Sequence, residues 1–357
     1  HQESFFPDRY LVEITRVANG QEEWLKFRLM PWLPPNSKQL ARYLKKVMGN
    51  LFSARKMECQ LVPKNNRPII GILSVDCDGH FAEYGKSYIA ASYVKNIESA
   101  GARVVPIRND LPAEELESLI NSINGVIFPG GGASLADSAY FSAGKMIYDL
   151  AIKENDNAKE PFPLWGACLG FEMLHIIISG LKKEDMLVSC DAENYSIPLE
   201  FTADAYTSRM FSSAQDGDRV MNILKEQAVT INMHQKCVPP EKFYSNNNTV
   251  GFFKILSTNK DRNGVEFIST VEGKKYPIFG TQWHPEKCQF EWTPKEVIDH
   301  SADAVFVGQY MANFFVNQAR QNTHHFVSEE AEEKALIYNY NPIDTSKISS
   351  FEQCYFF

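Results

Sequence analysis

The sequence has no long hydrophobic run and no excess of positive charge. None of its apolar stretches reaches the roughly 20 residues that a helix needs to cross a membrane, so no membrane span is expected. The 357 residues include 36 Lys and Arg against 44 Asp and Glu, which gives a formal net charge of -8. Clustered cations, which bind nucleic-acid phosphates, are missing after residue 66. Nucleic acid is therefore not an expected partner.

The sequence also lacks the short motifs of several cofactor sites. Its seven cysteines include no Cys-x-x-Cys pair, so neither a zinc site nor a thioredoxin-like motif is indicated. The patterns GxGxxG and GxxxxGK are both absent, which leaves nucleotide binding without support. The odd number of cysteines leaves at least one thiol free.

Residues 1–66 differ from the rest of the chain and are expected to form an N-terminal extension to a catalytic domain over residues 67–357. Apolar residues recur at helical spacing from Leu40 to Phe52, which predicts one amphipathic helix. Such a helix either docks on the body of the protein or binds a membrane surface or a partner. Because the chain begins at His1 without an apolar leader, a signal peptide is expected to be removed or never present.

From Pro68 onward, short β-branched runs alternate with helical stretches, which is typical of βαβ units. The pattern predicts an α/β fold with a mostly parallel central sheet flanked by helices. Strands are expected over residues 69–75, 103–107, 126–128, 162–166 and 279–283, with a helix from Leu169 and a closing helix over residues 304–319. Short strands are expected to dominate residues 190–268.

Cys168 lies between Gly166 and Gly170, where a buried strand is followed by an apolar helix. A nucleophile projects best from a sharp, strained turn, and only small neighbours let the backbone pass closely enough. The N-terminus of the following helix favours the thiolate form of such a cysteine. Cys168 is therefore the expected catalytic nucleophile.

A second glycine-rich turn, residues 129–132, follows the strand over residues 126–128. Such a turn at the end of a strand can point backbone N–H groups into the crevice where α/β sheets bind ligands. The N–H groups of Gly131 and of Leu169, the residue after the nucleophile, are the expected oxyanion hole.

His284 and Glu286 follow the last predicted strand in the sequence Gln282-Trp283-His284-Pro285-Glu286. A thiol that attacks an amide needs a base for its proton and an acid for the leaving amine, and one imidazole serves both steps. Glu286, two positions later in a segment expected to be extended, can orient that imidazole. Cys168, His284 and Glu286 are the expected catalytic residues.

These residues resemble class I glutamine amidotransferase-like enzymes, and within them the γ-glutamyl hydrolases, also called folate γ-glutamyl hydrolases. The resemblance runs from about Pro68 to Phe357 and includes residues 84–85, 88–95, 98–106, 208–211 and 331–338. It implies a flavodoxin-like fold with a nucleophile elbow, and cleavage of γ-linked glutamate from folate and antifolate polyglutamates through a thioester. Ala167 stands where the family leads us to expect Thr, and since both are small the chemistry is unaffected.

The resemblance further implies substrate contacts by Glu172, His234 and Tyr84, and a homodimer without metal or cofactor. It also implies a lysosomal and secreted glycoprotein, with Asn194 and Asn247 in Asn-x-Ser/Thr triplets as glycosylation candidates.

Two other functions stay open at this point. A glutaminase that feeds ammonia to a synthase usually has Gln four residues after the nucleophile, where this chain has Glu172. A catalytically inactive binding relative would be favoured by a missing thiol, His or glycine turn, and all are present. Of the remaining histidines, His175 is expected to be packed, and His324 and His325 are expected to lie in a solvated segment.

Overall fold

The computed structural model describes residues 4–5, 11–19, 22–29, 58–61, 64–157, 160–212 and 216–357. Two compact units are distinguished within the chain, His1–Lys64 and Asn65–Phe357. In the described ranges, every helix is too short or too polar to cross a membrane.

The first unit contains a four-stranded sheet in the order β1-β2-β3-β4: β1 (Ser4–Phe5), β2 (Leu11–Asn19), β3 (Glu22–Leu29) and β4 (Glu58–Leu61). β2 and β3 are antiparallel and pair as far as Asn19 and Glu22, so two residues connect their paired ends. β4 runs parallel to β3. These strands were not predicted, although Asn19-Gly20 between two apolar runs is a strong hairpin signal. The helix predicted over residues 40–52 lies outside the described residues.

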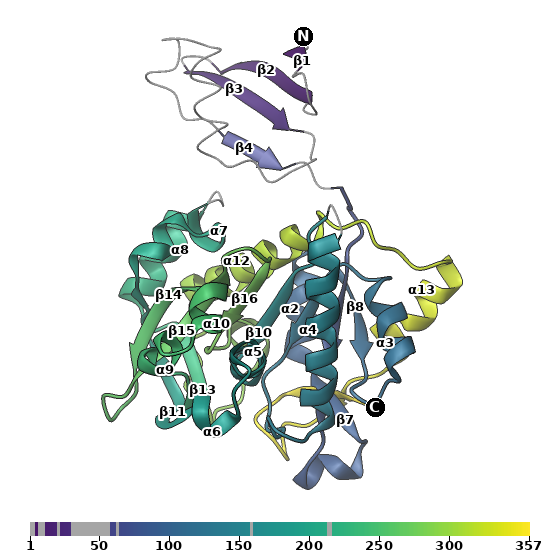
Figure 1. Ribbon diagram of the computed structural model, residues 1–357, viewed down its shortest axis with the longest axis vertical. Coiled ribbons are helices and arrows are strands. Elements are labelled where there is room, and N and C mark those ends of the chain that lie inside the picture. Colours follow the sequence, from purple (N-terminus) through teal and green to yellow (C-terminus); the bar gives the residue numbers. More distant parts are fainter. Residues whose placement is uncertain are drawn as a thin grey trace. The chain divides into compact units, whose positions relative to one another are not determined.

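The second unit is built on an eight-stranded sheet in the order β12-β14-β15-β16-β10-β9-β5-β8 (Figure 1). Neighbouring strands are parallel from β16 to β8, over β16 (Ile278–Thr281), β10 (Leu164–Ala167), β9 (Val126–Phe128), β5 (Ile69–Leu73) and β8 (Arg103–Ile107). The sheet continues through antiparallel pairs over β15 (Glu266–Gly273), β14 (Phe253–Lys260) and β12 (Glu200–Phe201). The predicted mostly parallel sheet is confirmed.

Helices pack against this sheet and against one another. α2 (Ala91–Ser99) and α12 (Ala302–Ala319) contact each other and β5. α4 (Ala139–Asn157) contacts α3 (Ala113–Ile120) and α5 (Leu169–Ser179). α5 is buried almost along its whole length, as its run of apolar residues predicts. The parallel strands β9, β10 and β16 all end beside the start of α5, which gathers the residues predicted to carry the chemistry.

Two smaller sheets complete the second unit. β11 (Val188–Ile197) and β13 (Thr230–Cys237) form an antiparallel pair. The other sheet has the order β17-β18-β7-β6, over β17 (Ile343–Asp344), β18 (Gln353–Phe356), β7 (Ser87–Ala90) and β6 (Val75–Asp76). The remaining elements are short: η2 (Gly79–Glu83), α6 (Lys183–Met186), η3 (Ala203–Thr207), α7 (Arg209–Ser212), α8 (Gly217–Glu226), α9 (Pro240–Tyr244), α10 (Asn247–Phe252), α11 (Lys287–Phe290), α13 (Glu329–Ala335) and η4 (Ile337–Asn339).

The expectation that short strands dominate residues 190–268 is only partly right, because helices α7 to α10 lie between the strands there. α8 buries Val220, Ile223 and Leu224, whose spacing of three and four residues is the signal of an amphipathic helix.

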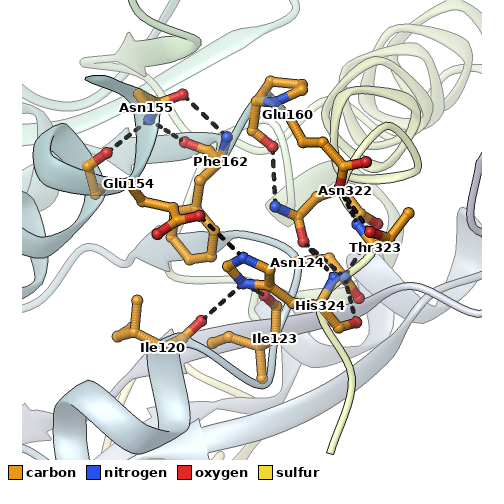
Figure 2. Close-up of polar contacts among 12 residues, drawn as sticks. Ile120, Ile123, Asn124, Glu154, Asn155, Glu160, Phe162, Asn322, Thr323 and His324 are labelled. Carbon is orange, nitrogen blue, oxygen red and sulfur yellow. Dashed lines mark hydrogen bonds and ion pairs between the residues drawn. The ribbon is translucent and has the colours of Figure 1, made fainter. Parts of the chain in front are cut away.

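The expectation that His324 is solvated is wrong. Its Nδ1 is 3.1 Å from the Ile123 carbonyl oxygen, and its Nε2 is 3.2 Å from Glu154 Oε1. Its ring also packs against Phe162, with centroids 5.8 Å apart. Figure 2 shows this ring among groups from distant parts of the chain, beside the Asn124–Asn322 contacts. The segment after α12 is thereby fixed to the body, whereas His325 is exposed as expected.

Candidate active site

Cys168 occupies a strained turn between β10 and α5. Its backbone has φ 49° and ψ -105°, a conformation that residues other than glycine rarely adopt. A Cβ atom on Gly166 would lie 2.5 Å from the Gly170 carbonyl oxygen, and one on Gly170 would collide with the backbone of Phe128. The two glycines therefore let the turn close, and the Cys168 N–H is fixed by a 2.8 Å hydrogen bond to the Thr281 carbonyl of β16.

His284 and Glu286 lie just beyond the end of β16 and are both buried. The Nδ1 atom of His284 is 2.6 Å from Glu286 Oε1. The segment was expected to be extended, but this is wrong, because Glu286 has helical φ and ψ at the start of α11. The turn at Pro285 brings the carboxylate back to the ring, which an extended segment would do less directly.

The electrostatics of this pair favour a charged imidazole. Burial opposes the charge, but the Glu286 carboxylate and the nearby Cys168 sulfur outweigh it and raise the pKa of His284 to about 10. Burial likewise opposes ionisation of Glu286, but the charge of His284 and its hydrogen bond keep the pKa of that carboxyl below its usual value. At neutral pH the pair is an imidazolium and a carboxylate.

Gly130 shows how closely Cys168 and His284 approach each other. A Cβ atom on Gly130 would lie 2.7 Å from His284 Cε1 and 3.2 Å from Cys168 Cβ. His284 Nε2 has no hydrogen-bond partner among the described residues, although Cys168 is near enough to influence the ring. With the Cys168 sulfur close by and its Nε2 unpartnered, the His284 ring is suited to carry a proton between the nucleophile and a leaving group.

Tyr93 on α2 connects the glycine turn with the His284–Glu286 pair. Its hydroxyl oxygen accepts a 2.8 Å hydrogen bond from the Gly130 N–H and lies 3.3 Å from His284 Nδ1. Tyr93 thus accepts from Gly130, while the next amide, that of Gly131, has no acceptor among the described residues. The sequence placed Tyr93 only within residues 88–95 of the family resemblance and gave it no role, since no local motif marks a tyrosine that acts across the fold.

The two predicted oxyanion donors lie at the turn and at the helix start. The Gly131 N–H donates to no acceptor among the described residues, and the Leu169 N–H is the first of α5, which has no partner within the helix. Gly131 is itself crowded, since a Cβ there would lie 3.0 Å from the Tyr88 hydroxyl. The Leu169 N–H follows Cys168 directly, whereas no described contact joins the Gly131 N–H to Cys168, so the oxyanion hole of two amides stays a prediction.

Glu172 lies one helical turn after Cys168 and is buried. Gln282 Nε2 donates to its Oε1 at 3.2 Å, and Gln282 Oε1 has no partner among the described residues. Burial raises the pKa of Glu172 to about 8, although the Gln282 hydrogen bond acts against it. The carboxyl is therefore largely neutral at pH 7. A cationic group bound beside it would restore the charge.

His234 and Tyr84 differ in their relation to Cys168. The carbonyl oxygen of Met233, the residue before His234, is 3.7 Å from Cys168 Sγ, so β13 borders the site. His234 is buried, and its ring packs edge-on against Phe267. Tyr84 is 44% exposed and stacks on Phe356 with centroids 5.1 Å apart. No described contact joins Tyr84 to Cys168, Glu172 or His234.

The two asparagines in glycosylation triplets also differ. Asn194 is partly buried, with its Nδ2 donating to the Lys295 carbonyl and its Oδ1 accepting from the Val297 N–H. Asn247 is exposed at the first residue of α10. Within the described ranges, no group of three or more His, Cys, Asp or Glu side chains is arranged to hold a metal ion.

Residues 68–286 match the peptidase C26 family. A γ-glutamyl hydrolase of Homo sapiens is 47% identical over 292 residues, which cover 82% of this chain and 90% of that protein. The chain belongs to the γ-glutamyl hydrolase family. A second member, γ-glutamyl hydrolase B of Dictyostelium discoideum, is 42% identical over 82% of this chain and 84% of its own length.

Among solved structures, the glutaminase domain of Trypanosoma brucei CTPS with bound acivicin is similar to this chain, with a TM-score of 0.45 at 13% identity. The match covers 72% of this chain and 96% of that one. The segment that matches the C26 family begins after the first unit and ends at Glu286, so it spans the Cys168 turn, the glycine turn and the His284–Glu286 pair. Membership of the γ-glutamyl hydrolase family makes this chain a hydrolase.

Proposed function

We propose that this chain hydrolyses the γ-glutamyl bonds of folate and antifolate polyglutamates through a thioester on Cys168. The observation that carries the proposal is the joint position of a strained cysteine, a histidine held 2.6 Å from a buried glutamate, and a glycine turn between them. The names of the relatives supply the type of bond.

The proposed reaction begins with attack of the Cys168 sulfur on the γ-carbonyl carbon. The C=O electron pair moves to the oxygen, which the N–H groups of Gly131 and Leu169 hold. His284 Nε2 carries the proton that the Cys168 thiol gives up to become the attacking thiolate. As the C–N bond breaks, Nε2 passes this proton to the leaving amine, and a thioester remains. Neutral His284 then takes a proton from water, the hydroxide attacks the thioester, and the C–S bond breaks. Glu286 stabilises the imidazolium that is regenerated.

Substrate recognition is proposed to rest on Glu172, His234 and Tyr84. Glu172 and the unpartnered Oε1 of Gln282 together offer acceptors for the N–H or ammonium group of a bound glutamate. His234 lies on the strand that borders Cys168. Tyr84 enters only through family resemblance, and its exposed ring is available to a large ligand that extends from the site.

We further infer a lysosomal and secreted glycoprotein that acts as a homodimer, with residues 1–66 as an extension outside the catalytic domain. The location and the homodimer rest on the resemblance to the γ-glutamyl hydrolases alone. Of the two triplets, the exposed Asn247 is the better glycan acceptor, because the side-chain amide of Asn194 is already engaged.

The test is to incubate the protein with a folate pentaglutamate and to identify the first products by mass spectrometry. Release of glutamate or of γ-linked glutamate pieces is expected, and the product lengths distinguish terminal from internal cleavage. Free glutamine is the matched control: ammonia release from glutamine without cleavage of the pentaglutamate would assign the chain to glutaminase chemistry instead.

A further inference from the structure

The β11–β13 pair carries two thiols that the proposed reaction does not use. Val188 of β11 pairs directly with Cys237 of β13, and the register shifts between Ser189 and Ala192. Cys190 lies in this bulge, two residues along from Val188. Diagonal neighbours on one face of an antiparallel pair are roughly 7–8 Å apart at Cα, and a bulge bends the strand locally. Cys190 and Cys237 are therefore neighbours across the pair.

Both thiols contact one small apolar cluster that is separate from the main core. The cluster contains Ala192, Ile197, Cys237 and Phe267, and Cys190 packs against it. Neither cysteine is in a disulfide. Cys237 is fully buried, whereas Cys190 is partly exposed. A reagent in solvent can therefore reach Cys190 directly, and Cys237 only through Cys190.

His234 is held beside Cys190 by a defined set of hydrogen bonds. Cys190 Sγ is 3.4 Å from His234 Nδ1, which is also 2.9 Å from the Lys236 carbonyl oxygen. The ring's Nε2 is 3.0 Å from Asn232 Oδ1. Because the amide nitrogen of Asn232 donates to two backbone carbonyls, its oxygen must face the ring. The histidine is thus fixed as a neighbour of the sulfur.

The same contacts favour ionisation of one thiol. The hydrogen bond with Cys237 lowers the pKa of Cys190; burial acts against this decrease, and His234 adds to it. The Cys237 thiol has a raised pKa, chiefly because of its hydrogen bond with Cys190. A low-pKa, accessible thiol next to a second, buried thiol is the usual arrangement of attacking and resolving cysteines.

We propose that Cys190 and Cys237 form a dithiol site that a small disulfide, such as glutathione disulfide, oxidises to an intramolecular disulfide. The Cys190 thiolate attacks one sulfur of the reagent, whose S–S bond breaks and releases one glutathione thiolate. Cys237 then attacks the Cys190 sulfur of the mixed disulfide, and the second glutathione leaves with the Cys237 proton. Two protein thiols are oxidised, and one small disulfide is reduced to two thiols.

Oxidation would also change the wall of the active site, and this step rests on the proposed function. β13 carries Met233, whose carbonyl oxygen is 3.7 Å from Cys168 Sγ, together with His234. When the Cys190 sulfur turns to Cys237, His234 loses its sulfur neighbour. If His234 contacts the substrate as proposed, the KM of the oxidised protein rises several-fold while kcat changes less.

The experiment incubates the reduced full-length protein with glutathione disulfide at pH 7, followed by an acid quench, alkylation of free thiols, digestion and peptide mapping. The expected result is a peptide pair joined through Cys190 and Cys237. Cys288 is the internal control, because burial raises the pKa of its thiol to about 12 and it should remain reduced. An unmodified Cys190, or a glutathione adduct on Cys190 that never resolves, would overturn the proposal.

Two single variants separate the steps. In Cys237→Ser, the mixed disulfide on Cys190 should accumulate, and in Cys190→Ser, Cys237 should stay reduced. The activity of Cys190→Ser after incubation with glutathione disulfide also measures any loss that comes from modification of Cys168. A joined peptide with unchanged KM would support the disulfide and refute the substrate contact of His234, so the two proposals fail separately.

Discussion

Cys168 and Cys190 each lie beside a histidine, but the two surroundings differ in every feature that catalysis needs. Cys168 occupies a strained turn at the start of α5, with backbone amides nearby and a histidine bonded to a buried glutamate. Cys190 lies in a bulge of a two-stranded sheet, and its histidine is bonded to an asparagine and a backbone carbonyl. A thiol beside an imidazole is therefore not enough by itself to make a cysteine catalytic.

The two cysteine–histidine pairs differ in the residue that bonds the histidine and in their position in the fold. Glu286 supplies a negative charge that favours imidazolium, whereas Asn232 supplies only a neutral oxygen. The turn at Cys168 also lies where parallel strands end and a helix begins, which is where α/β sheets bind ligands. The β11–β13 pair forms a separate two-stranded sheet. Its second thiol suits redox chemistry instead.

The largest expected effect on hydrolysis comes from replacing the cysteine of each pair by alanine in turn. Cys168→Ala should fold normally and lose hydrolysis by about a thousandfold or more, because a methyl group cannot form a thioester. Cys190→Ala should keep kcat and lose only the several-fold in KM that follows when His234 loses its sulfur neighbour. The measurement is kcat/KM on a folate polyglutamate for both variants. Comparable losses in the two, or substantial turnover by pure Cys168→Ala, would contradict the assignment.

The second prediction concerns the removal of the Glu286 carboxylate, which bonds His284. Glu286→Gln should lower kcat less than His284→Asn, for which a loss of about 10²–10⁴-fold is expected. Gln keeps the shape but makes the partner of His284 neutral, as Asn232 is for His234. The pKa of His284, measured by NMR titration, should then fall from its raised value. Equal losses in the two variants would show that orienting the ring matters as much as the ring itself.

The third prediction concerns Tyr93, which has no counterpart at the Cys190 pair. Tyr93→Phe removes the acceptor of the Gly130 N–H and loosens the glycine turn. We expect kcat to fall about fivefold, the scale of a hydrogen bond of roughly 1 kcal/mol, with little change in KM. Tyr310→Phe is the matched control, since its buried hydroxyl bonds the Met210 carbonyl. A loss of stability alone in both variants would make Tyr93 merely structural.

A fourth prediction uses the raised pKa of Glu172. Because the folded state holds this proton up to about pH 8, against 4.5 for the unassisted carboxyl, stability should fall as pH rises between these values. Glu172→Gln removes that fall, so the variant should be more stable at pH 7 by about 3.5 kcal/mol, at about 1.4 kcal/mol per pH unit above 4.5. Denaturant unfolding at pH 5 and pH 7 measures it.

The same variant tests the substrate contact. Loss of the carboxyl should reduce kcat/KM for folate polyglutamates by roughly 1.5–3 kcal/mol, the scale of a charged hydrogen bond, even though the fold is stabilised. A variant that is more stable and fully active would leave Glu172 without a role in binding.

The smallest effect is expected outside both cysteine–histidine pairs. Removing residues 1–66 should leave kcat/KM and Cys190 reactivity unchanged, because both pairs lie in the second unit. A truncated protein that folds without activity would show that the extension completes the site.

Local patterns were sufficient for much of the fold. The strands over residues 103–107 and 126–128 were predicted with their observed bounds, because runs buried on both faces of a parallel sheet are continuously apolar. α8 and the β2–β3 hairpin were missed, although helical spacing at Val220, Ile223 and Leu224 and the Asn19-Gly20 turn signal were present. Both elements therefore follow from local signals in the sequence.

The sequence by itself determined the chemistry of this protein: a cysteine between glycines, a glycine turn and a histidine followed by a glutamate are local patterns with local causes. Only the tertiary structure decided which groups act together. Tyr93 bonds the glycine turn from a helix elsewhere in the chain, burial turns Glu172 into a largely neutral acid, and a bulge brings Cys190 beside His234 and Cys237. These properties depend on the surroundings of a side chain across the fold, which spacing along the chain does not encode.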